Sequence, residues 1–248
     1  MRILKTLALG LMIATPAAAF DMGAMTASER QDFRAEIRQY LMENPEVLME
    51  AIGVLEARQA EQQEAADDAL VLSQADALFS DENSWVGGNP EGDITMVEFL
   101  DYRCGYCKKA HSEVAELVSS DGNIRLIVKE FPILGEASVL ASRFAIATKR
   151  SFGDDAYKAV NDGLMTMRSD VTESAVRKLA KGLGYDADVI LAEMDSVEVT
   201  SIIQANRALG QELQINGTPT FVIGNEMIRG YVPLDGMRGI IEELRQQG

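Results

Sequence analysis

The apolar residues of this chain follow two patterns, one typical of helices and one typical of buried strands. Residues 26–79 are helical in pattern, and between Phe33 and Leu55 large apolar side chains recur every three or four positions. Asn44-Pro45 interrupts that rhythm, because proline disfavours helical backbone at the residue before it. From Glu56 to Asp68, strong helix formers continue without any large apolar residue. We expect this stretch to be a polar helix that bridges parts of the molecule through solvent.

The N-terminal helical segment has an apolar stripe that a short helix pair cannot bury by itself. The stripe comprises Phe33, Ile37, Tyr40, Leu41, Leu48, Ile52 and Leu55. It can pack against copies of itself, or it can fold back as a cap on the rest of the same chain. The polar spacer favours self-association, so we expect residues 26–68 to join identical chains into a homo-oligomer.

A strand–helix–strand unit follows and begins an α/β layer. Ile94 to Asp101 is almost continuously apolar and predicts a buried strand. Cys104 to Ser119 carries apolar residues on one helical face, and Ile124 to Phe131 predicts a second strand that ends at Pro132. The fold class expected from this unit is α/β.

The rest of the chain is mainly helical in pattern. Helical stretches run from Glu136 to about Leu213, where Gly217-Thr218-Pro219 ends the pattern. Two short apolar runs then flank the Gly224-Asn225 turn, which is typical of a β-hairpin. A closing helix is expected over residues 234–245.

Charge and the N-terminal residues narrow the function classes. The formal net charge is -16, and no cluster of Lys and Arg is present to displace counterions, so we expect no nucleic-acid partner. Arg2 and Lys5 precede the apolar run Thr6–Ala14, which is too short to span a bilayer. Ala17-Ala18-Ala19 supplies small residues for cleavage, so residues 1–19 are predicted to be a signal peptide; the alternative is a membrane anchor. The mature protein is then expected in an oxidising space outside the cytoplasm.

The two cysteines, Cys104 and Cys107, form a Cys-x-x-Cys motif where a strand gives way to a helix. A bridge that closes so short a loop constrains the unfolded chain little, so a structural disulfide explains the pair poorly. Unpaired N–H groups at a helix start stabilise a thiolate, which is the species that attacks disulfides. We expect Cys104 to attack and Cys107 to resolve the mixed disulfide.

Metal binding is the rival interpretation of the cysteine pair. A structural zinc site needs four ligands, and the chain offers two Cys and one His. Two thiolates can bind Cu(I) with few other ligands, so a Cu(I) site at Cys104 and Cys107 stays open as an alternative. No cofactor is expected for the redox reaction.

Thr218-Pro219 is a second candidate element. A proline just before a short strand can follow a cis peptide bond, and the backbone beside it can pair with an extended substrate chain. The alternative is a simple break between a helix and a strand.

In combination these motifs resemble the DsbA family of thiol–disulfide oxidoreductases, from about Asn83 to the C-terminus. The matching segments are Glu98-Phe99-Leu100-Asp101-Tyr102, the Cys104/Cys107 motif, Lys129-Glu130-Phe131-Pro132 and Gly217-Thr218-Pro219-Thr220-Phe221. The resemblance implies a thioredoxin-like fold over residues 81–248, a helical insertion at about 136–196 and a cis Thr218-Pro219 bond. The apolar stripe and the polar spacer predict a separate N-terminal helical stalk over residues 20–80, ahead of that domain.

Within that family, the sequence is most similar to the suppressor-of-copper-sensitivity protein C (ScsC) branch. The Cys-Gly-Tyr-Cys-Lys form, the Lys-Glu-Phe-Pro-Ile-Leu-Gly run and Asn44-Pro45-Glu46-Val47-Leu48 carry that likeness. It implies a trimer joined by N-terminal helices and disulfide isomerase or reductase activity on exported proteins with cysteines. The predicted signal peptide makes the periplasm the expected location, and a membrane redox partner is expected to recycle the cysteine pair. A monomeric dithiol oxidase and a Cu(I)-binding copper-tolerance protein are the alternatives.

Five further residues could tune the cysteines. Gly105 and Tyr106 replace the Pro-His pair of the archetypal oxidase, which favours a less oxidising couple. The family has an acid at the position of Glu98, which could accept the proton of Cys107, although Glu98 could instead pair with Lys129. His111 shares a helix face with both cysteines, where a structural role is the alternative.

Overall fold

The computed structural model describes residue 23 and residues 25–247, so the predicted signal peptide at residues 1–19 lies outside the described residues. The chain divides into two compact units, one up to Arg58 and one from Gln59 to Gly248. Within the described residues, no helix is both long enough and apolar enough to cross a membrane.

The first unit consists of helices with no core of their own. Helix α1 (Ala27–Glu43) begins with a capping box, in which Thr26 and Glu29 satisfy each other's backbone N–H groups, and none of its residues is buried. Helix α2 (Glu46–Ser73) starts after Asn44-Pro45, as the proline predicts. The stripe residues are exposed by these fractions: Phe33 40%, Ile37 44%, Tyr40 53%, Leu48 48%, Ile52 47% and Leu55 54%.

The second unit is built on a five-stranded mixed sheet in the order β1-β3-β2-β4-β5. The central strands β2 and β3 run parallel, and every other neighbouring pair is antiparallel. The strands are β1 (Trp85–Gly88), β2 (Ile94–Leu100), β3 (Ile124–Glu130), β4 (Thr220–Ile223) and β5 (Glu226–Arg229). The sequence did not predict β1, because the glycines that end it are typical of turns.

The two faces of this sheet belong to different hydrophobic clusters. Alternation along β2 sends Met96 and Leu100 into a large cluster that also contains both cysteines. Val97 and Phe99 point into a smaller cluster on the other face. The same alternation decides which charged residues can reach the cysteines.

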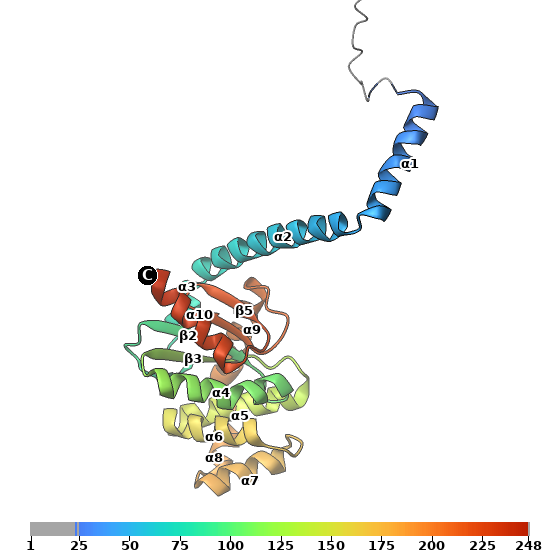
Figure 1. Cartoon of the computed structure of the whole chain (residues 1–248). Helices are drawn as coiled ribbons and strands as arrows, with labels where there is room; N and C mark the ends of the chain where they lie inside the picture. Colours follow the sequence, from blue (N-terminus) through green and yellow to red (C-terminus); the bar gives the residue numbers. More distant parts are fainter. Residues whose placement is uncertain (1–22, 24, 248) are drawn as a thin grey trace, which may run out of the picture. The chain divides into compact units, whose positions relative to one another are not determined.

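Helix α4 (Gly105–Asp121) follows β2 directly, and the remaining helices fill the chain between β3 and β4 or close it. Figure 1 shows α5 to α8, in yellow and light orange, gathered on one side of the sheet, where they pack against one another. These helices are α5 (Glu136–Phe152), α6 (Asp154–Thr166), α7 (Glu173–Leu183), α8 (Ala187–Met194), α9 (Val197–Glu212) and α10 (Leu234–Gln247). The mixed α/β thioredoxin-like fold with helices inserted before β4 is the fold that the sequence predicted.

The end of α2 and helix α3 (Ala75–Phe79) belong to the second unit, so the division falls well before residue 80, where we expected the stalk to end. Val71 and Leu78 are buried in the smaller cluster. Asp67, which is 5% exposed, forms an ion pair with Arg229 of β5. The stretch that we expected to be polar all round therefore turns inward over its last residues.

Candidate active site

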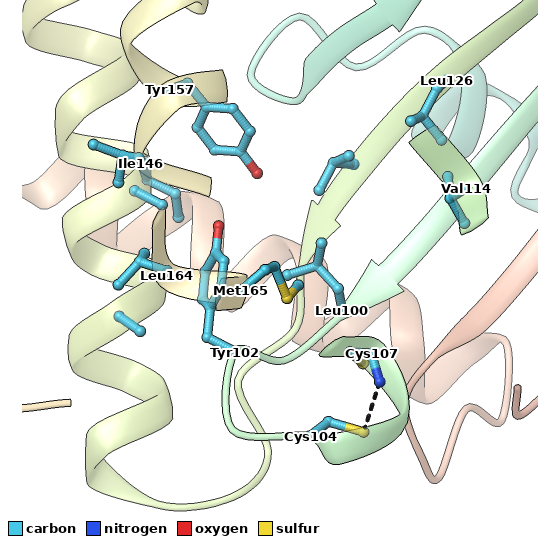
Figure 2. Packing of buried hydrophobic residues seen from close by; sticks show 14 of the residues in the cluster. Leu100, Tyr102, Cys104, Cys107, Val114, Leu126, Ile146, Tyr157, Leu164 and Met165 are labelled. Atoms are coloured by element: carbon cyan, nitrogen blue, oxygen red, sulfur yellow. Dashed lines mark hydrogen bonds between the residues drawn. The ribbon is translucent and has the colours of Figure 1, made fainter. Parts of the chain in front are cut away.

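Cys104 is the N-cap of α4, with extended backbone at φ -72° and ψ 119°. Its sulfur accepts a hydrogen bond from the backbone N–H of Cys107 at 3.4 Å, the dashed line in Figure 2. Its thiol donates to the carbonyl oxygen of Thr218 at 3.0 Å. A thiolate at this position would face the unpaired N–H groups of the helix start, which suits an attacking sulfur.

Cys107 lies one turn further along α4 and is fully buried, whereas Cys104 is 8% exposed. Both cysteines are free thiols. Burial raises the pKa of the Cys107 thiol well above its ordinary value, and a negative charge on Cys104 would raise it further. Cys107 therefore stays protonated until a nearby group accepts its proton, which separates the roles of the two sulfurs.

The Thr218-Pro219 peptide bond is cis, as the resemblance implied. It lies in the loop between α9 and β4, and the Thr218 carbonyl reaches the Cys104 sulfur across 114 residues of sequence. The carbonyl of Pro219 accepts a hydrogen bond from the N–H of Gly230, which holds the loop to the end of β5. The fold therefore places Thr218-Pro219 next to Cys104, although the two candidate elements are far apart in sequence.

Glu98 is a buried carboxyl group on the same sheet face as the cysteines, and its Oε1 has no hydrogen-bond partner. Burial, with a smaller contribution from the charge of Glu130, raises the pKa of Glu98 to about 8. A negative charge on Glu98 would raise the pKa of the Cys107 thiol, so the two groups are neighbours. A cavity of about 640 Å³ is lined by Glu98, His111 and Asn161, among others.

The alternative in which Glu98 pairs with Lys129 is wrong. Lys129 neighbours Phe99 in the register of β2 and β3, so its side chain points to the opposite sheet face from Glu98. Its ammonium group donates to the carbonyl oxygen of Ala77 at 2.9 Å and to Asp81 at 2.5 Å. The structure does not bring Lys129 to the cysteines, because strand alternation turns it toward α3.

The remaining candidates, His111, Tyr106 and Gly105, lie on helix α4 with Cys107. Nε2 of His111 lies 2.8 Å from Asp162 on α6, and burial lowers the pKa of His111 although Asp162 opposes that shift. Tyr106 is 63% exposed and stacks on Tyr231 with ring centroids 5.9 Å apart. A Cβ added at Gly105 would meet no atom, so packing does not require glycine there.

Asp101 is a buried site residue to which sequence reasoning gave no role of its own. Its carboxylate accepts hydrogen bonds from the N–H groups of Arg103, Ile133 and Leu134 and from the Ser138 hydroxyl, at 2.8–3.0 Å. It therefore fixes the turn before Cys104 to the loop after β3. No local signal could have shown this, because most of the partners lie more than 30 residues away.

A second buried carboxyl network lies behind the active-site turn. Glu130 accepts hydrogen bonds from the hydroxyls of Tyr102 and Tyr157, both at 2.6 Å, and Asn161 donates to the Tyr102 hydroxyl at 3.0 Å. Figure 2 shows the two hydroxyls pointing toward one another from the active-site turn and α6. Burial raises the pKa of Glu130 to about 7. This network of hydrogen bonds connects α6 to Tyr102, which lies two positions before Cys104.

The described residues contain no group of three or more His, Cys, Asp or Glu side chains placed to hold a metal ion. The cysteine pair remains the set of soft ligands considered for Cu(I).

Comparison with known proteins places this geometry in a family. Residues 95–242, more than half of the chain, match the DSBA-like thioredoxin domain. The chain belongs to the DsbA-like thioredoxin family. Residues 29–62 match the N-terminal domain of the copper resistance protein ScsC, which confirms the resemblance to that branch.

The similar proteins include thiol–disulfide oxidoreductases. A thioredoxin-like oxidoreductase from Silicibacter pomeroyi is 40% identical, covers 69% of this chain and 97% of its own, and superposes with a TM-score of 0.65. ScsC from Proteus mirabilis is 27% identical over 90% of this chain and 100% of its own, with a TM-score of 0.66. Disulfide bond formation protein D from Bacillus subtilis is 24% identical over 63% of this chain and 74% of its own.

Sodium/proton antiporters also match, but the chain spans only about a quarter of their length; for that of Herminiimonas arsenicoxydans the share is 25%. Membership of the DsbA-like family and the Cys104/Cys107 geometry support a thiol–disulfide oxidoreductase.

Proposed function

We propose that this DsbA-like protein rearranges wrong disulfides in exported proteins, as a periplasmic homo-oligomer that acts through Cys104 and Cys107. The observation that carries the proposal is the apolar stripe of the first unit, of which Phe33, Ile37 and Ile52 are 40–47% exposed. Exposed aromatic and aliphatic residues at helical spacing are typical of a surface that associates. The likeness to ScsC over both units supports the same function, with a trimer as the favoured assembly.

The first chemical step is attack by the Cys104 thiolate on a substrate disulfide. A Cys104–substrate disulfide forms, the substrate's own disulfide breaks, and one substrate sulfur leaves as a thiolate. In isomerisation that thiolate attacks another disulfide of the substrate, and Cys104 is finally released unchanged. The numbers of thiols and disulfides are the same before and after, so neither the protein nor the substrate is oxidised.

When rearrangement stalls, Cys107 resolves the mixed disulfide. The protein becomes oxidised at Cys104–Cys107, and the substrate leaves with two thiols. The buried Cys107 thiol must first lose its proton. The neighbouring Glu98 could accept it in those molecules in which its carboxyl is ionised, which are the minority at neutral pH because its pKa is about 8. A membrane reductant would then restore both thiols.

Light scattering on the chain from Phe20 onward tests the assembly, and refolding of a scrambled multi-disulfide protein by the reduced form tests the activity. We expect an oligomer and recovery of the native substrate. A monomer that oxidises reduced substrates but leaves scrambled ones unchanged would overturn the proposal in favour of the dithiol oxidase. Tight Cu(I) binding with no exchange above background would favour the copper-tolerance alternative.

A further inference from the structure

We infer that a groove beside Cys104, between the β3–α5 loop and the end of α9, receives the substrate chain next to the disulfide under attack. This inference rests on the proposed exchange activity and adds a specificity site to it. The groove has a volume of about 640 Å³. Its walls are formed by Phe131, Pro132, Ile133, Leu134, Gly135 and Val139 on one side and by Arg207, Gln211, Ile215 and Asn216 on the other.

The loop that forms one wall is clamped. Asp101 accepts from the N–H groups of Ile133 and Leu134 at 2.9 and 3.0 Å. Arg103 donates to the Leu134 carbonyl at 3.2 Å, and Arg207 donates to the Pro132 carbonyl at 2.8 Å. A loop tied at three successive residues keeps its shape, so little conformational entropy is lost when a partner binds it.

The clamped loop presents apolar side chains to solvent. Ile133 and Leu134 are 38% and 44% exposed, whereas Phe131 and Ile215 on the floor are only 4% and 5% exposed. A Cβ at Gly210 would lie 2.4 Å from the Phe131 ring, so glycine lets α9 approach the floor closely. An apolar floor and wall with polar side chains opposite is the anatomy of a protein-binding surface.

The groove lies beside the reactive cysteine, which indicates what binds in it. Arg103, which contacts the rim, directly precedes Cys104, and Asn216 of the opposite rim lies two residues before Thr218. The groove therefore offers a path across these borders to a polypeptide that brings a disulfide sulfur to Cys104. The occupant is therefore an extended segment of the substrate, with a large aliphatic or aromatic side chain close to its reacting cysteine.

The test compares two short peptides whose single cysteine is disulfide-bonded to glutathione, one with Leu and one with Ser near that cysteine. The reduced protein gives up two electrons, and the products are the Cys104–Cys107 disulfide, the peptide thiol and glutathione. We expect the wild type to prefer the Leu peptide about tenfold in kcat/KM. The double variant Ile133→Ala/Leu134→Ala should lose that preference and react with oxidised glutathione at the wild-type rate.

The matched control is Leu183→Ala/Val189→Ala, because these side chains are 38% and 47% exposed on α7 and α8, away from the groove. It should keep the preference for the Leu peptide. Equal rates of the wild type on both peptides would overturn the inference, as would equal losses of the groove variant on every disulfide. A change of oligomer mass in the groove variant would assign the groove to a second copy of the chain instead.

Failure of the proposed function would look different. In that case the wild type would react with neither peptide nor with oxidised glutathione, and no specificity could exist to be lost. A wild type that reacts with all three disulfides but ignores the neighbouring residue would reject the groove alone.

Discussion

The two units of this chain manage their apolar residues in opposite ways. The helix α1 buries none of its residues, and large apolar side chains from Phe33 to Leu55 stay exposed. The unit from Gln59 onward buries its apolar residues in two clusters, one on each face of the sheet. Apolar burial is the main favourable term in folding, so the second unit carries its own stability, whereas the first leaves its apolar stripe open to the association proposed above. The difference separates the unit that holds the cysteines from the unit that we propose associates.

The largest expected effect separates chemistry from association. Cys104→Ser should lower exchange with any disulfide by about three orders of magnitude or more, because the serine hydroxyl is not ionised at neutral pH. Its light-scattering mass should equal that of the wild type. Cys107→Ser is the matched variant and should accumulate the mixed disulfide on a non-reducing gel. A change of the light-scattering mass in Cys104→Ser would show that association depends on the cysteine site.

The reverse change removes association and spares chemistry. Ile37→Glu/Ile52→Glu places charges on the apolar stripe, where burial of an unpaired carboxylate would cost several kcal/mol. We expect the mass to fall to that of one chain, with rescue of scrambled protein lost and reaction with oxidised glutathione unchanged within about twofold. Glu36→Gln/Glu50→Gln, at exposed positions of the same helices, is the control and should keep the wild-type mass.

The pH dependence of stability should arise in the catalytic unit. Folding raises the pKa of Glu98 from 4.5 to about 8, so between these values the folded chain holds a proton that the unfolded chain has lost. The contribution of Glu98 to the free energy of unfolding is therefore fully present below about pH 4.5 and should be lost as pH rises toward 8, by roughly 1 kcal/mol per pH unit.

Glu98→Gln should flatten that fall in denaturant titrations of the reduced protein. A smaller slope up to about pH 7 should remain from Glu130, whose pKa is raised to about 7. Glu82→Gln, on an exposed loop, should leave the whole profile unchanged. An unaltered slope in Glu98→Gln would mean that Glu98 is already ionised in the fold.

The smallest expected effect places the border between the units within α2. Asp67→Ala removes the buried partner of Arg229 and should destabilise the catalytic unit by about 2–3 kcal/mol, less than a fully buried pair because the Arg229 side chain is 35% exposed. Glu61→Ala, on the same helix, should cost less than about 0.5 kcal/mol, since Glu61 is exposed. Equal shifts of Tm in the two variants would argue that α2 does not belong to the catalytic core.

Local signals predicted much of this architecture. Proline at position 45 located the break between α1 and α2, and apolar runs located β2 and β3. The Cys-x-x-Cys spacing at the start of a predicted helix indicated that Cys104 and Cys107 form the redox pair. These features are encoded within a few residues, so the sequence could show them without a structure.

Features that depend on distant residues could not be predicted. The ion pair of Asp67 with Arg229 joins residues 162 positions apart, and the Glu130 network joins residues 27–28 positions apart. The role of Asp101 depends on the loop after β3. Lys129 and Glu98 have opposite charges and close positions in sequence, yet strand alternation and the parallel register keep them on different faces.

The contact between the Cys104 thiol and the Thr218 carbonyl has a thermodynamic consequence. When the thiol ionises, the donor is lost, and two electron-rich atoms face each other across about 3.0 Å. An incoming N–H group that bonds the carbonyl would draw electron density from it and relieve that repulsion. By linkage, such a substrate would favour the thiolate by the same factor by which the thiolate favours the substrate. Substrate binding and ionisation of the Cys104 thiol would then be coupled by one free energy, which arises at the Thr218 carbonyl oxygen.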